Sequence, residues 1–224
     1  MEVILKRSSF IVLFVVSLTL SSAACLTSLH PWFTEKDLVF DPALIGTWQD
    51  IANGDVTWTF ERQNDTTYTL IDTRNGDEPR LDPKATEKKT VTTRLTARLM
   101  RVGDARFLDI SAGDEWTDSS MLQLLLVNSH GLAKVSLDGD TLRVAFLDDD
   151  RLEGMLRDKR VVLSHEVADT TGGADDPPTR VHSQTRRLLL TAPTRELQAF
   201  LTTYARDDAA FEEGQLMRRK RPAR

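Results

Sequence analysis

The sequence has a single cysteine, Cys25, among 224 residues, so no disulfide can form within one chain. It also lacks the short motifs of several common enzyme classes. There is no G-x-S-x-G nucleophile elbow, no phosphate-binding P-loop and no G-x-G-x-x-G dinucleotide fingerprint. A folded domain must therefore be held together by its hydrophobic core alone, and about 180 residues are enough for one such domain.

Metal-binding patterns are missing as well. The sequence around His165-Glu166 continues Val-Ala-Asp, so it lacks the second histidine of the H-E-x-x-H zinc motif. The acidic run 148–150 lacks the alternating ligands and the final Glu of an EF-hand loop, and it is better explained as a helix N-terminus. The other histidines are scattered: His30, His130 and His182. The sequence therefore predicts no catalytic residues, no metal site and no cofactor, and a protein that is not an enzyme.

The charge is acidic overall, with a net value of -5. Without residues 1–24 the chain has 27 basic and 33 acidic residues, a net charge of -6. Such a body repels nucleic acid, because binding to phosphates depends on Lys and Arg. Basic residues gather instead in segment 218–224, which is interpreted as a solvated tail, although it could also touch phosphates or anionic lipid. These residues are Arg218, Arg219, Lys220, Arg221 and Arg224.

The first 24 residues have the three-part layout of a secretory signal. Lys6 and Arg7 are followed by the apolar run Phe10–Leu20 and then by the small residues 21–24. The apolar run is shorter than the approximately 20 residues that span a bilayer. Residues 1–24 are therefore expected to be a leader that directs export.

Alternation of apolar and polar residues dominates the chain after Gly46, which is typical of strands with one buried face. The clearest case is Lys89–Val102, which is long enough that we expect a bend or bulge. Short turns such as Asp138-Gly139-Asp140 join the strands and predict an up-and-down antiparallel meander. The other expected strands are Val56–Phe60, Tyr68–Leu70, Phe107–Ile110, Met121–Val127, Leu132–Leu137, Leu142–Leu147, Val161–Val167 and Arg187–Thr191.

Two helices are predicted among the strands. Asp148 can cap the first, Asp148–Arg160. The second begins near Thr194, where apolar residues recur at helical spacing. Pro193 suits its first turn, and Thr191 or Thr194 can cap it.

The start of the first strand resembles that of the lipocalin (calycin) family. In Gly46-Thr47-Trp48 a Gly stands two residues before a Trp, and Asp41-Pro42 just before can cap a short helical turn. The resemblance implies an antiparallel barrel of about eight strands, with a C-terminal helix and one inserted short helix, in which Gly46 and Trp48 form the barrel-closing motif. It also implies a basic residue stacked on Trp48, for which Arg218 and Lys220 are candidates.

The stretch Ser22-Ala23-Ala24-Cys25 resembles a lipobox, in which the Cys is lipidated and becomes the mature N-terminus. Ser22 stands where that pattern prefers Leu, and ordinary signal cleavage is the alternative. Leu26 after the Cys implies the outer membrane, facing the periplasm. Segment 25–40 is too apolar for a solvated tether, so part of it should pack on the domain, 41–217. Most of the mature chain resembles bacterial envelope lipoproteins of unassigned function.

Three functions remain open at this point. A lipid-anchored envelope protein could bind a small apolar ligand in its barrel, since eight strands can hold one. It could instead be a structural or assembly module with a filled barrel, which large inward residues would favour. An enzyme using carboxylates at the barrel mouth has no motif to support it. The large residues in question are Trp58, Phe60, Tyr68 and Phe146.

Overall fold

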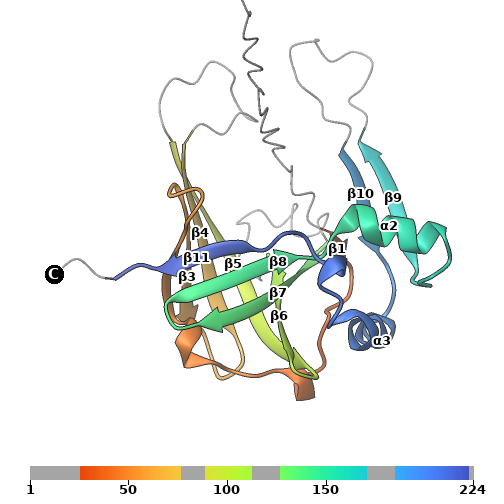
Figure 1. Ribbon diagram of the computed structural model, residues 1–224, viewed down its shortest axis with the longest axis horizontal. Helices are drawn as coiled ribbons and strands as arrows, with labels where there is room; N and C mark the ends of the chain where they lie inside the picture. The colour runs from red at the N-terminus through yellow and green to blue at the C-terminus, as the bar shows by residue number, and fades with distance from the viewer. Residues whose placement is uncertain (1–25, 77–88, 113–126, 171–184, 222–224) are drawn as a thin grey trace, which may run out of the picture.

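The computed structural model describes residues 26–76, 89–112, 127–170 and 185–221. In this part of the chain, eleven strands form one sheet, and eight of them close into a barrel whose neighbouring strands are all antiparallel (Figure 1). The predicted mainly-β antiparallel barrel with two helices is thereby confirmed. The barrel strands are β2 (Gly46–Asp50), β3 (Val56–Arg62), β4 (Tyr68–Gly76), β5 (Lys89–Val102), β6 (Ala105–Ser111), β7 (His130–Asp138), β8 (Thr141–Phe146) and β11 (Gln215–Arg219).

The strands β2 to β8 follow one another as a meander, and β11 closes the barrel between β8 and β2. The prediction gave Lys89–Val102 with the bounds that β5 has. Of the expected bend or bulge, the bulge is not found, because β5 pairs in unbroken register with β4 over Lys89–Ala97 and with β6 over Thr96–Val102. The strand is long because its first part pairs with β4 and its last part pairs with β6.

The barrel strands β5 to β8 have two apolar faces over part of their length, so the domain has two cores. In β5, Leu99 belongs to the core inside the barrel, whereas the next residue, Met100, belongs to a second core outside it. In β6, Phe107 faces out and Leu108 faces in. This is the period-two geometry of a strand, and it leaves an apolar outer wall on β5 to β8 that other elements must cover.

The cover is formed by two helices, a small extension of the sheet and the N-terminal segment. The helices α2 (Asp149–Arg157) and α3 (Thr194–Tyr204) both contribute buried side chains to the outer core. Strand β1 (Thr27–Ser28) pairs antiparallel with β7 and parallel with β10 (Thr185–Leu190), and β10 pairs with β9 (His165–Thr170). In Figure 1 these elements stand together on the right of the barrel.

The two helices begin differently. Asp148 caps α2 as predicted, since its Oδ1 accepts a hydrogen bond from the backbone N–H of Arg151 at 2.8 Å. The predicted cap of α3 by a threonine is wrong. Pro193 is itself the N-cap, and the hydroxyl of Thr194 donates to the carbonyl of Pro31, so this side chain joins the helix to the N-terminal segment.

Segment 26–42 packs on the barrel, as its apolar composition predicts. Leu26 and Trp32 are buried in the outer core, and Leu38 forms a bridge with Met100 of β5. The segment contains the short 3-10 turn η1 (Glu35–Asp37) and reaches a second one, η2 (Pro42–Leu44), which Asp41 caps as predicted.

The chain's end differs from the expectation. A third 3-10 turn, η3 (Asp208–Ala210), leads to β11, which follows α3 and includes Arg218 and Arg219 of the expected basic tail. Arg218 pairs with Gln49 and Thr141, and Arg219 with Trp48. The helix α3 is therefore not the last element of the fold. The predicted strand Met121–Val127 lies, apart from Val127, outside the described residues.

Candidate functional site

The interior of the barrel is packed with aromatic side chains. Trp58 contacts Phe60 and Phe146 edge-on, with ring centroids 6.2 and 6.3 Å apart, and Phe60 contacts Tyr68 at 6.1 Å. Phe60 and Tyr68 are fully buried, and burial raises the pKa of the Tyr68 hydroxyl. All four aromatic residues that the sequence places inside the barrel are there.

The end of the barrel crossed by η2, which we call the floor, is closed by Trp48 and one arginine. The Arg219 guanidinium lies 4.1 Å from the centroid of the Trp48 ring and donates to the carbonyls of Ile45, at 2.7 Å, and Ala43. The stacking residue is thus Arg219, which stands between the two candidates Arg218 and Lys220. Successive side chains of a strand point to opposite faces, so the two candidates point away from the inward face that Arg219 occupies.

Gly46 fits this closure in two ways. Its φ of 125° is a conformation that side chains disfavour, and an added Cβ would lie 2.9 Å from Nη1 of Arg219. Trp48 is fully buried, and its indole N–H donates to the carbonyl of Leu44 at 2.9 Å. The residues of the predicted barrel-closing motif therefore meet at the floor.

Towards the opposite end, the mouth, the inward side chains are less covered. Leu95, Ile110 and Phe146 pack on the inner core but are only partly buried. Two carboxylates join them. Asp50 accepts a hydrogen bond from Gln215, and Asp72 pairs with Arg74 at 2.9 Å. The second oxygen of Asp72 is buried and has no hydrogen bond among the described residues.

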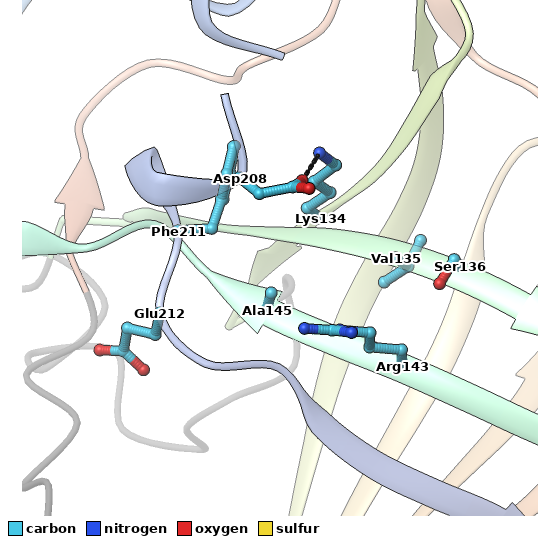
Figure 2. A pocket seen from close by; sticks show the side chains of 8 residues that line it. All are labelled: Lys134, Val135, Ser136, Arg143, Ala145, Asp208, Phe211 and Glu212. Atoms are coloured by element: carbon cyan, nitrogen blue, oxygen red, sulfur yellow. Dashed lines mark hydrogen bonds and ion pairs between the residues drawn. The ribbon is translucent and has the colours of Figure 1, made fainter. Parts of the chain in front are cut away.

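A groove opens on the outer wall between β7, β8 and the chain around η3 (Figure 2). Its volume is about 250 Å³. Figure 2 shows Lys134 and Asp208 on one side, Arg143 lying along β8, and Glu212 beyond Ala145. The eight lining residues are Lys134, Val135, Ser136, Arg143, Ala145, Asp208, Phe211 and Glu212.

The charged side chains of the groove differ in whether they have a partner of opposite charge. Lys134 donates to Asp208 at 2.7 Å and lies over the Phe211 ring, and this hydrogen bond, with help from Arg143, lowers the pKa of Asp208. Glu212 is half-buried, and burial first and the nearby Asp149 second raise its pKa. Arg143, in contrast, forms no hydrogen bond or ion pair with any residue in the described ranges.

A buried hydrogen-bonded pair of side chains ties the N-terminal segment to the barrel. Asp109 of β6 is fully buried, hydrogen-bonds Nδ1 of His130 at 2.8 Å, and accepts from the backbone N–H of Trp32 at 2.9 Å. The strand register pairs His130 with Ser111 and Ser28. Both serines are buried, and in the described part of the chain neither hydroxyl is hydrogen-bonded to the His130 ring. The pair therefore positions the segment against the barrel.

The remaining predicted residues fall as follows. His165 lies in β9 and its Nδ1 donates to the carbonyl of Leu163. Within the described ranges no three or more His, Cys, Asp or Glu side chains come together as a metal site would require. Cys25, the predicted lipidation site, lies outside the described residues, as does His182.

Sequence reasoning missed the groove. Alternation places Lys134 and Arg143 on the outer face of their strands, which is the one available signal. Asp208 and Phe211 come from a segment with no periodic pattern, so nothing in the sequence indicated that they would meet these strands.

No protein-family model, no curated protein and no solved structure matches the chain. None of the helices in the described residues has the length and apolar character needed to cross a membrane.

Proposed function

We propose that this protein is a lipid-anchored component of the bacterial envelope, held in the outer membrane by Cys25, whose lipocalin-like barrel is a structural or assembly module. The observation that carries the choice of a module is the packed interior. Large side chains that are at most 1 % exposed fill the barrel from the floor upward: Trp48, Phe60, Tyr68, Leu70, Leu99, Leu108 and Leu142. Protein interiors of this kind leave few voids larger than a water molecule.

If the barrel is filled, other molecules must bind on its outer surface. The interior side chains are needed for stability, because burying one large apolar side chain contributes about 1.5–3 kcal/mol. Opening a cavity would remove that contribution, so a ligand could not enter the lower barrel without unfolding part of it. The exposed wall and the groove are the surfaces left for contacts with other molecules.

Binding of a small apolar ligand is the second candidate, limited to the mouth. The partly exposed inward side chains of Leu95, Ile110 and Phe146 favour it. If it is correct, Ile110→Asp should abolish saturable binding of a hydrophobic probe while Ile51→Asp, at an exposed position, should not.

Native mass spectrometry of protein extracted from membranes tests both parts of the proposal. A module is expected to carry lipid on Cys25 and no other lipophile, and a panel of fatty acids should give no saturable binding. A stoichiometric retained lipophile would favour the carrier instead. Replacing Cys25 with Ser should release the protein from membranes, and a variant that stays membrane-bound would overturn the anchor.

A further inference from the structure

Strand β7 connects the groove to the start of the described residues, because β1 pairs with His130 and Gly131 and the groove is lined by Lys134, Val135 and Ser136 of the same strand. Leu26 is 4 % exposed, and the next two residues already form β1 between β7 and β10. Leu26, Ala145 and Phe211 belong to one buried apolar cluster, and the last two also line the groove. A lipid on the residue before Leu26 would therefore have no flexible tether between it and the domain, and it would hold the groove within reach of the membrane surface.

The lining of the groove is mixed in charge. Two cations, Lys134 and Arg143, and two carboxylates, Asp208 and Glu212, surround the apolar surface of Phe211. This balance does not favour a purely anionic or a purely cationic ligand. It complements a group that carries one charge of each sign.

Arg143 is the cation that is ready to bind. Lys134 is already paired with Asp208, whereas Arg143 forms no ion pair in the described residues. Its side chain lies flat against Gly214, where an added Cβ would come within 2.4 Å of Nε. The glycine therefore leaves room for the guanidinium along the groove. Guanidinium is the side-chain group best suited to bind a phosphate.

The size of the groove limits the ligand. Its volume of about 250 Å³ is just below the roughly 300–1,000 Å³ of pockets for drug-sized molecules. This is room for a small polar headgroup and not for an acyl chain.

We propose that the groove binds the zwitterionic headgroup of a membrane phospholipid that carries a phosphate and a primary ammonium group. Arg143 holds the phosphate, and the carboxylate of Glu212 accepts hydrogen bonds from the ammonium, while Asp208 stays paired with Lys134. The proposal rests on the lipid anchoring proposed above, because the anchor brings the headgroups to the groove. Headgroup binding on the barrel wall would fix the orientation of the domain on the bilayer.

The test uses the full mature chain with Cys25→Ser, so that binding is independent of the anchor. Flotation with vesicles of phosphatidylcholine alone, phosphatidylcholine with phosphatidylethanolamine, and phosphatidylcholine with phosphatidylglycerol compares three headgroups. We expect at least a fivefold preference for the phosphatidylethanolamine vesicles. Arg143→Gln should remove that preference, and Arg94→Gln, at an exposed position on β5, should keep it.

Gly214→Ala is a second variant that leaves the arginine in place but displaces it, and it should weaken binding as Arg143→Gln does. Equal binding to all three vesicles, or retention of the preference in both variants, would show the proposal to be wrong. Preferred binding to phosphatidylglycerol would show general surface electrostatics instead.

Two more results separate the sources of failure. Soluble phosphoethanolamine should compete for the groove better than inorganic phosphate does, and equal competition would show a simple anion site. Mass spectrometry of the wild-type protein reports the anchor separately. If the protein is lipidated but shows no preference for phosphatidylethanolamine vesicles, only the headgroup site is disproved. If it shows that preference but is never lipidated, only the anchor is disproved.

Discussion

The guanidinium of Arg219, near the end of the chain, lies 4.1 Å from the centroid of the Trp48 ring, near the start of the barrel. The same group also donates to the carbonyls of Ala43 and Ile45 beside η2. One side chain thus holds together the first and last strands and the turn that crosses the floor.

Removing this side chain should open the floor. Arg219→Ala is expected to lower the free energy of unfolding by about 2–4 kcal/mol, from a cation–π contact and two hydrogen bonds of a charged donor. Urea unfolding measures it. Arg218→Ala, at an exposed position on the same strand, should change the midpoint little, and equal losses would mean that the stacking contributes nothing.

Gly46 should tolerate no side chain. Gly46→Ala combines a φ of 125° with a close approach to Arg219, and we expect it to destabilise the fold by about 2 kcal/mol or more. Gly139 is the matched control, since it also has a positive φ but nothing within 4 Å of an added Cβ. Its replacement by Ala should cost about 1 kcal/mol. The difference between the two thermal or urea midpoints isolates the clash with Arg219.

Loss of the Asp109 carboxylate should release the N-terminal segment. Asp109→Ala leaves His130 and the backbone N–H of Trp32 without their partner, at an expected cost of about 2–4 kcal/mol. Trypsin cleavage after Lys36 should be slow in the wild type and faster in this variant. Asp104→Ala removes an ion pair with Arg206 that is almost fully exposed, and it should leave the cleavage rate unchanged. Rapid cleavage of the wild type would contradict the packing of this segment.

The contribution of Glu212 by itself should make the protein less stable at neutral pH than in mild acid. Its pKa in the folded state is raised by burial and by Asp149, so the favourable contribution is present below the unfolded pKa of about 4.3 and is lost as the pH rises through the folded value. Glu212→Gln should therefore stabilise the fold at pH 7, by less than about 1 kcal/mol because the group is partly solvated.

The measurement is the difference in urea midpoint between Glu212→Gln and the wild type at pH 7 and at pH 4. It should be positive at pH 7 and close to zero at pH 4. Glu213→Gln, at the exposed neighbouring position, should show no such dependence. A variant that destabilises at pH 7 would mean that the carboxylate is needed in its charged form.

Among the barrel strands, the sequence predicts those with alternating apolar residues and misses β11, whose inward residues are mixed. Lys89–Val102 alternates cleanly and was placed correctly. The inward face of β11 consists of Gln215, Met217 and Arg219, so no apolar alternation marks it. Gln215 is inside because it binds Asp50, and Arg219 because it stacks on Trp48. Both reasons lie in partners that are far away in the sequence.

The candidate sites also divide into those that local sequence predicts and those that depend on distant contacts. Gly46 and Trp48 could be picked out because their roles follow from local chain geometry and side-chain size. The groove could not, since its walls come from two strands and from a segment about 65 residues later. Contacts between these distant parts bring them together, among them the packing of Phe211 on the outer wall and the backbone hydrogen bond from Glu212 to Phe146.

The position of β11 sets the order in which the protein can be completed. The residue pair Asp50 and Met217 is separated by most of the domain in sequence, so the barrel cannot close before ribosomes have synthesised β11. Until then, β2 and β8 have unpaired edges, which are templates for association with other chains. Folding should be slow, as it is for folds dominated by distant contacts, and deletion of β11 should give an aggregating protein.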